Sequence, residues 1–208
     1  MNAPSPLLLA RRHVQHLEFA VSCAELGARP HTISILTRLP MTPLRALLRH
    51  APGNLRGRRP DTREWYHSAN LPCRAEASAV VSLFLRLDIS GIDARFALHG
   101  AYRHYAAACH GAPRISFDRA FDLVAHTTGR WIADKASFSM LACPICHCGY
   151  LTARTDILPR NNNECPFCKL AARYGKDARI QMSYPTRPLP AMIELYRFGP
   201  FRSMTWHE

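Results

Sequence analysis

Two Cys-x-x-Cys pairs carry the clearest chemistry in this sequence: Cys143-Pro-Ile-Cys146 and Cys165-Pro-Phe-Cys168. A gap of two residues lets one tight turn direct both sulfurs at the same point, and two such turns complete a tetrahedron. Proline suits each turn because it fixes φ and has no N–H to leave unpaired. Zn²⁺ accepts four thiolates, and such a set leaves no open position for catalysis. The spacing therefore predicts one structural zinc ion per chain, bound by Cys143, Cys146, Cys165 and Cys168.

The same cysteines allow three other interpretations. Cys143-Pro-Ile-Cys146-His147 also has the pattern of covalent c-type haem attachment, which would leave the second pair unexplained. A Cys-x-x-Cys pair can be a thioredoxin-like redox site, but that site requires a βαβ context that the sequence does not show. His147 or Cys148 can also replace Cys146 as a ligand. The symmetry of the two pairs favours Cys146 and makes Cys148 a bystander near the metal.

Length and composition limit the architecture. A chain of 208 residues corresponds to one or two domains, and an apolar content of 48% is ample for a core. No segment approaches the roughly 20 apolar residues of a membrane span, and the N-terminus lacks the charge order of a secretion signal. We therefore expect a cytoplasmic protein without membrane partners, in which eight cysteines indicate metal rather than disulfides. Three of them lie in apolar helical stretches and are expected in the core: Cys23, Cys73 and Cys109.

Positive charge is concentrated early in the chain. The formal net charge is +12, and residues 29–63 contribute eight Arg against one Asp. Residues 64–141 are nearly neutral, with eight basic and seven acidic residues. A base-composition bias explains why 24 of the 27 basic residues are Arg, but it does not explain their clustering. The clustering favours a polyanionic partner, and nucleic acid is the simplest one.

Apolar residues recur at helical spacing through most of residues 1–141, so we expect a mainly α fold with the aromatic residues in its core. Gly27 is a natural stop for the first helix, while Thr42 fits an N-cap and Pro43 the first position of the third. The periodicity predicts helices over 9–26, 31–39, from 43 onward, 72–87, 92–109 and 116–135.

The second and third helices form a helix-turn-helix-like pair, because both are short and a tight turn joins them. The second member of the pair carries Arg45 and Arg49, four residues apart. A helical hairpin without DNA contact fits the pattern equally well. The following Gly-, Pro- and Arg-rich segment, 51–61, reads as an exposed arm that can track phosphates, or as a solvated loop. We predict DNA contacts from Arg38, Arg45, Arg49, Arg56, Arg58 and Arg59.

The remaining chain divides into two parts after the helical DNA-binding and partner-docking region of residues 1–141. Residues 142–181 form the predicted Cys₄ zinc-ribbon-like module. Residues 182–208 are rich in proline without sustained periodicity, so we expect a partly disordered tail or an interaction strand. An alternative to the arginine arm is that the zinc module and a partner read DNA. That alternative assigns the contacts to Arg154, Arg160 or Lys169.

Motifs typical of enzymes do not occur in this sequence. There is no phosphate-binding glycine loop, no His-Glu-x-x-His helix and no nucleophile elbow. The eleven His residues are scattered along the chain. We therefore expect no catalytic residues and no enzymatic activity.

The order of these features resembles the FlhC family over roughly residues 10–180. The resemblance rests on Glu25-Leu-Gly-Ala-Arg29, the Leu39-Pro-Met-Thr-Pro-Leu44 junction, the Arg-Gly-x-x-Pro segment before Trp65, and the terminal Cys₄ module. FlhC is one subunit of the bacterial flagellar master transcriptional activator. The resemblance implies the same four zinc ligands, a heterohexamer with FlhD, binding to promoter DNA upstream of flagellar operons, and recruitment of RNA polymerase. It does not explain the tail beyond residue 180.

Two classes of function remain open at this point. The first is a zinc-stabilised, DNA-binding transcriptional activator of flagellar operons that acts with a partner. The second is a zinc-ribbon RNA-binding or adaptor protein, in which the basic arm contacts structured RNA. Binding to duplex promoter DNA and to RNA at several salt concentrations separates them.

Overall fold

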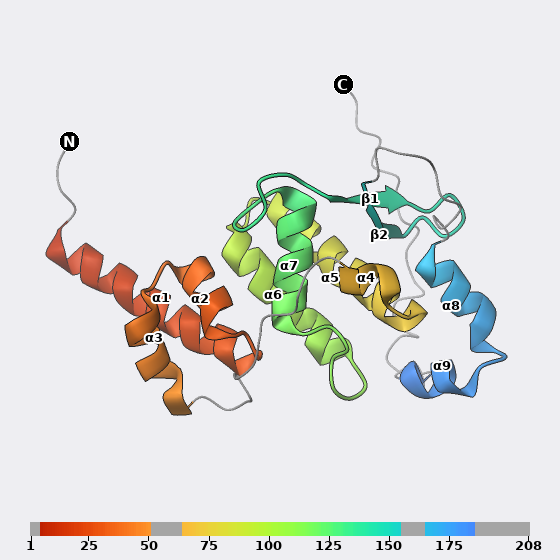
Figure 1. Ribbon diagram of the computed structural model, residues 1–208, viewed down its shortest axis with the longest axis horizontal. Helices are drawn as coiled ribbons and strands as arrows, with labels where there is room; N and C mark the ends of the chain where they lie inside the picture. The colour runs from red at the N-terminus through yellow and green to blue at the C-terminus, as the bar shows by residue number, and fades with distance from the viewer. Residues whose placement is uncertain (1–4, 51–63, 155–164, 186–208) are drawn as a thin grey trace, which may run out of the picture.

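The computed structural model describes residues 5–50, 64–154 and 165–185, and these are mainly helical (Figure 1). The predicted fold class, a mainly α protein with a small cysteine module near its C-terminus, is confirmed. In chain order the elements are α1 Pro6–Glu25, α2 Pro30–Thr37, α3 Met41–Leu47 with a 3₁₀ turn at Leu48–His50, α4 Glu64–Ser68, α5 Leu71–Ile89, α6 Ala94–Ala108, α7 Phe117–Thr128, β1 Phe138–Ala142, β2 Gly149–Ala153, α8 Pro166–Tyr174 and α9 Ala178–Ser183.

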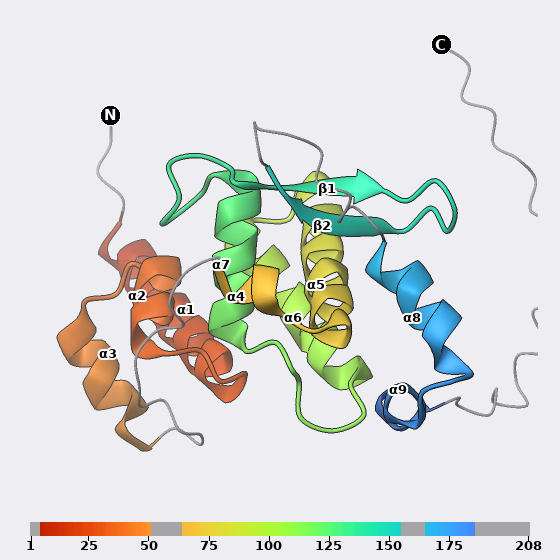
Figure 2. The same ribbon diagram turned by 45° about the vertical axis from the view of Figure 1, so that its right-hand side comes forward.

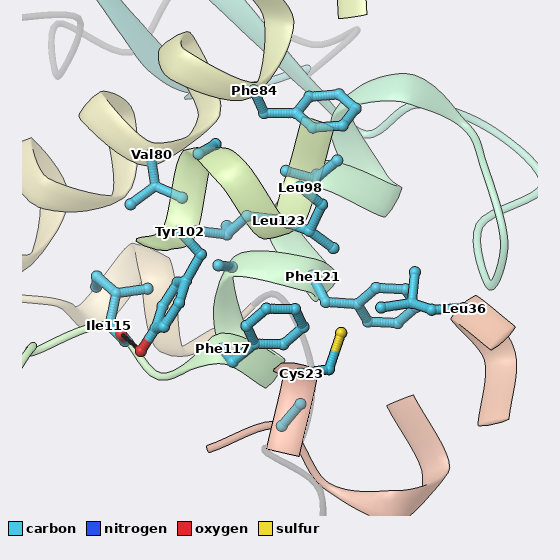
Figure 3. Packing of buried hydrophobic residues seen from close by; sticks show 14 of the residues in the cluster. Cys23, Leu36, Val80, Phe84, Leu98, Tyr102, Ile115, Phe117, Phe121 and Leu123 are labelled. Atoms are coloured by element: carbon cyan, nitrogen blue, oxygen red, sulfur yellow. Dashed lines mark hydrogen bonds between the residues drawn. The ribbon is translucent and has the colours of Figure 1, made fainter. Parts of the chain in front are cut away.

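The hydrophobic core lies among α5, α6 and α7, with α1 and α2 packed on one side (Figure 3). Phe84 of α5 and Phe117 and Phe121 of α7 are fully buried. Cys23 of α1 and Leu36 of α2 reach the same cluster next to the two α7 phenylalanines. The prediction that the aromatic residues of these helices form core is confirmed for Tyr102, Tyr105, Phe117 and Phe121, which helical spacing places on inner faces. It is wrong for Phe96, which is 50% exposed.

Asp118 on α7 holds the start of α2 in place. Its carboxylate accepts hydrogen bonds from the Thr32 hydroxyl at 2.6 Å and from the backbone N–H of Arg29 at 3.2 Å. The guanidinium of Arg29 also lies 3.4 Å from the same carboxylate, which is almost fully buried. Arg29, one of the eight arginines in the basic segment, therefore stabilises the packing of α2 on α7.

α2 and α3 are joined by a short turn, as the helix-turn-helix-like prediction required. Arg38 ends α2 in the left-handed conformation with φ 60°, and the Ser34 hydroxyl donates to the carbonyl of Leu39 at 2.7 Å. The predicted N-cap at Thr42 is wrong. Pro40 is the residue that caps α3, because its extended ψ of 147° lets its carbonyl accept the N–H of Leu44. Pro43 lies inside the first turn, where a missing N–H costs nothing.

The two strands pair antiparallel, with Phe138 opposite Ala153 and Ala142 opposite Gly149. This hairpin lies across one end of the α5–α7 bundle (Figures 1 and 2). Two hydrogen bonds hold it there: Tyr66 donates to the Leu151 carbonyl at 2.6 Å, and the Leu151 N–H donates to Ser78 Oγ at 3.0 Å. The small module is thereby attached to α4 and α5 of the helical part.

The helices of the structure differ from the predicted ones in two places. The helix expected over residues 116–135 ends at Thr128, because Gly129 adopts φ 67° and directs the chain away. Trp131 then folds back and stacks on Phe121 at 5.2 Å. The periodicity predicted no helix beyond residue 135, yet α8 spans Pro166–Tyr174 and α9 spans Ala178–Ser183. Both helices are short, so apolar periodicity has few turns in which to show itself.

Among the described residues, no helix is both long enough and apolar enough to cross a bilayer. The predicted arm at 51–61, and residues 186–208 of the predicted tail, lie outside the described residues.

Of the three cysteines predicted in the core, Cys23 is fully buried, whereas Cys73 and Cys109 are half-buried against the core. Burial raises the pKa of the Cys23 thiol from 9.0 to about 12. Above pH 9 the unfolded chain loses this proton while the folded chain keeps it, so the free energy of unfolding falls as pH rises. The expected slope from this residue is about 1.4 kcal/mol per pH unit between pH 9 and pH 12.

The variant Cys23→Ala tests whether the Cys23 thiol causes this fall in the free energy of unfolding at high pH. At pH 8 its free energy of unfolding should be about 1–2 kcal/mol below that of the wild type, owing to the small cavity. From pH 9 to pH 11 the gap should shrink, because the variant lacks the titrating thiol. Urea unfolding at each pH measures the gap, and a constant gap would contradict the prediction.

Candidate functional site

The four predicted metal ligands come from two separate turns that the fold brings together. Cys143 follows the last residue of β1, and Cys146 lies in the turn that leads to β2. Cys165 is the N-cap of α8, and Cys168 lies in the first turn of that helix. Because Pro166 occupies the first helical position, the helix begins at once and directs both sulfurs to the same side.

The four sulfur atoms lie within 4.8 Å of one another. Cys143 Sγ is 3.7 Å from Cys168 Sγ, and Cys146 Sγ is 3.6 Å from Cys165 Sγ. A tetrahedron with metal–sulfur bonds of about 2.3 Å requires edges of about 3.8 Å. The measured edges fit this geometry, so the cluster can hold a metal ion with all four positions filled by protein.

The electrostatics of the cluster also suit a cation. Backbone N–H groups of Cys146 and Ile145 point at the sulfur of Cys143 and lower its pKa to about 6. The neighbouring Cys146 sulfur raises the pKa of Cys168 to about 12. A positive ion that joined the four sulfurs would favour the thiolate form of each. The N-terminus of α8 adds partial positive charge beside two of the four.

His147 and Cys148 lie next to the cluster but are not members of it. Both side chains are exposed. His147 adopts φ 58°, and its N–H donates to the Cys143 carbonyl at 2.9 Å, which closes the turn. The haem interpretation left the second cysteine pair without a role, whereas the fold places that pair directly against the first.

Glu76, a buried acidic residue that was not predicted as functional, joins the cysteine module to the helical part. Glu76 of α5 accepts hydrogen bonds from Tyr105 at 2.6 Å and from Tyr184 at 2.8 Å, and it forms an ion pair with Arg114. Arg114 also donates to Ser183 at 2.8 Å. Residues from α5, α6 and the end of α9 thus meet at one carboxylate. The available signal was an acidic residue inside the apolar run 75–81.

An apolar cavity of about 310 Å³ lies beside this carboxylate. Ala75 and Ala79 of α5 form one wall, and Leu170 and Tyr174 of α8 form the opposite one. Tyr184 lies at its edge, where it both bonds to Glu76 and accepts a hydrogen bond from Tyr174 through its carbonyl. The cavity therefore lies in the interface between α5 and the helices of the cysteine module.

The predicted DNA-binding arginines fall into two groups. Arg38, Arg45 and Arg49 are exposed on the α2–α3 pair. Arg56, Arg58 and Arg59 lie outside the described residues. Among the residues of the alternative interpretation, Arg154 is exposed and Lys169 is half-buried, whereas Arg160 also lies outside the described ranges.

No curated protein matches the chain. The family described as "Flagellar transcriptional activator (FlhC)" matches residues 10–181, which include every described helix from α2 to α8 and the four clustered cysteines. The chain therefore belongs to the FlhC family of flagellar transcriptional activators.

Proposed function

We propose that this protein is a DNA-binding transcriptional activator of flagellar operons that acts in the cytoplasm in complex with FlhD and recruits RNA polymerase. The observation that carries the proposal is the family match over residues 10–181. The exposed arginines of the α2–α3 pair agree with it, because a helix-turn-helix-like pair can present basic side chains to a DNA groove. No residue in this function acts as a catalyst.

The cofactor of the proposed activator is one structural Zn²⁺ ion bound by Cys143, Cys146, Cys165 and Cys168. Four thiolates are a common ligand set for structural zinc, and the sulfur separations suit its bond length. The ion would hold the β1–β2 turn against the start of α8. It has no open position for water or substrate, so its contribution is to folding.

The N-terminal end of α1 offers a surface for the partner. It extends past α2 and α3 (Figure 1), and Leu7, Leu8 and Leu9 are 77%, 52% and 51% exposed. Val14, further along the same helix, is 51% exposed. Apolar side chains gathered on a projecting helix are typical of a protein interface. FlhD is the occupant that family membership suggests.

The proposal predicts that the chain and FlhD purify together as one complex that binds flagellar promoter DNA. The chain expressed alone should be poorly soluble, because the apolar end of α1 lacks its partner. Native mass spectrometry of the co-expressed proteins gives the stoichiometry, and fluorescence anisotropy gives the affinity for a promoter duplex. Scrambled duplex and structured RNA serve as competitors.

Preference for the promoter over scrambled duplex supports the activator, and at 0.15 M salt that preference should reach about 10³-fold or more. A lone chain that is monodisperse and binds the promoter as tightly as the mixed complex would contradict the partnership. Tighter binding to structured RNA than to the promoter would favour the RNA-binding alternative instead.

A further inference from the structure

The geometry points to a phosphate-binding surface on α1, the end of α2 and the start of α6, which would hold the backbone of the DNA duplex bound by this protein. We call it the α1–α6 basic cluster. It consists of Arg12, His13, His16, Arg38 and Arg95. This inference rests on the proposed function, and it adds α1 and α6 to a DNA-binding surface that the sequence placed in residues 29–63 alone.

Packing next to the cluster holds α1 and α6 together. Phe19, one turn after His16, meets the ring of Phe96 edge-on, with centroids 5.0 Å apart. Ser22, a further turn along α1, lies 2.5 Å from His99 through Oγ and Nε2. These contacts bring the N-terminal turn of α6 beside the middle of α1. Residues separated by 77 positions in the sequence therefore lie side by side.

The pKa of His16 responds to the positive charges around it. Burial lowers the pKa of its imidazole, and the positive charges of Arg95, His13, Arg12 and Arg38 lower it further. The charges that act on it come from α1, α2 and α6 together. Like charges held close to one another destabilise a fold unless an anion joins them. Arg12 and His13 lie one turn before His16 on α1, and the packing of Phe19 on Phe96 places the start of α6, with Arg95, beside them. Positive side chains gathered on one surface in this way favour a polyanionic ligand.

Arg95 is the member of the cluster that already has a counter-charge. Asp93 caps α6 and pairs with the guanidinium of Arg95 at 2.9 Å. The ring of Phe96 lies 5.5 Å from the same guanidinium, so Arg95 is held in a defined place. Within the ranges that the structure describes, neither Arg12 nor Arg38 has an ion pair. Both are exposed and free to contact a ligand.

The position of Arg38 identifies the anion as a DNA phosphate. Arg38 lies in the turn between α2 and α3, seven residues before Arg45 on the helix that the proposal directs toward the DNA groove. In helix-turn-helix proteins the residues flanking the recognition helix contact the phosphates beside the groove. The basic cluster begins at this turn. It would therefore contact the DNA phosphates next to those that lie beside α3. Such contacts strengthen binding without reading sequence.

The test uses the full chain co-purified with FlhD and a double variant, Arg12→Gln with Arg38→Asn. Asparagine is chosen because position 38 has φ 60°, which Asn tolerates better than most residues. Each lost phosphate contact should flatten the slope of log affinity against log salt by about 0.9, so the double variant should lose about 1.8. At 0.1 M salt its affinity should fall roughly tenfold or more, equally for promoter and scrambled duplex.

The matched control is Arg86→Gln with Arg173→Gln, which removes the same net charge from two exposed positions outside the cluster. It should keep a salt slope within about 0.5 of the wild type. Thermal unfolding of both variants should match the wild type, since the four substituted side chains are exposed. A slope that is unchanged in the cluster variant, or lowered equally in the control, would overturn the inference.

Two further results separate the possible failures. A wild-type complex that binds no DNA would overturn the proposed function and this inference together, whereas wild-type binding with an unaffected cluster variant would overturn the inference alone. Inorganic phosphate is the other source of the same chemistry, so DNA binding is repeated with millimolar phosphate at constant ionic strength. Unchanged binding is expected. Displacement of DNA from the wild type, but not from the variant, would assign the cluster to free phosphate and overturn the inference.

Discussion

Cys143→Ala or Cys168→Ala is expected to abolish metal binding and to unfold the cysteine module. In small domains structural zinc contributes about 10–16 kcal/mol of apparent binding free energy, which is comparable to the stability of a whole domain. Without the ion, the four sulfurs have no common partner, and the start of α8 loses its attachment to the β1–β2 turn. Metal content by mass spectrometry should fall from one ion per chain to less than a tenth of one.

Limited proteolysis supplies the structural readout for this prediction. New cleavage sites should appear within residues 142–185, because the loss of the ion frees the start of α8 from the β1–β2 turn. Cys148→Ala is the matched control, since this exposed thiol lies two residues from Cys146 but outside the cluster. It should keep a full complement of metal and the wild-type digestion pattern. Loss of one equivalent of metal in the Cys148 variant would overturn the ligand assignment.

Glu76→Ala is expected to lower the free energy of unfolding by on the order of 3 kcal/mol. The substitution leaves the Arg114 charge unpaired and removes the acceptor of two tyrosine hydroxyls, those of Tyr105 and Tyr184. Breaking a buried ion pair costs about 3–5 kcal/mol, and the lower value applies because the Arg114 side chain is 34% exposed. Urea unfolding monitored by circular dichroism measures the change.

The Asp88–Arg130 pair provides the control for Glu76. Its atoms are 2.7 Å apart, but the Arg130 side chain is 44% exposed and Asp88 is 19% exposed. Asp88→Ala should therefore cost less than about 1 kcal/mol. Glu76→Ala should also make the α8–α9 segment more sensitive to protease, since Tyr184 loses its bond to α5. An equal loss of stability in the two variants would contradict this prediction, because Glu76 would then contribute no more free energy than the partly exposed Asp88–Arg130 pair.

The cluster of four cysteines and most helices could be predicted from the sequence, because both depend on short-range geometry. A Cys-x-x-Cys spacing places two sulfurs on one turn whatever surrounds it. Helical periodicity identified α5, α6 and α7 to within a few residues at their starts, and Gly27 ended α1 as expected with φ 82°. α7 ended early at Gly129, where a glycine signal was present but the apolar pattern continued to Ile132.

Tertiary structure alone decided which distant residues meet. Arg114 and Tyr184 are up to 108 positions from Glu76 in the sequence, and only the folded chain brings both side chains to its carboxylate. Charge counts placed Arg29 with the other early arginines, whereas the fold pairs Arg29 with Asp118 and leaves Arg38 exposed. Composition records how many charges a segment holds. Their separation after folding, which sets the strength of every Coulomb interaction, depends on which helix faces pack together.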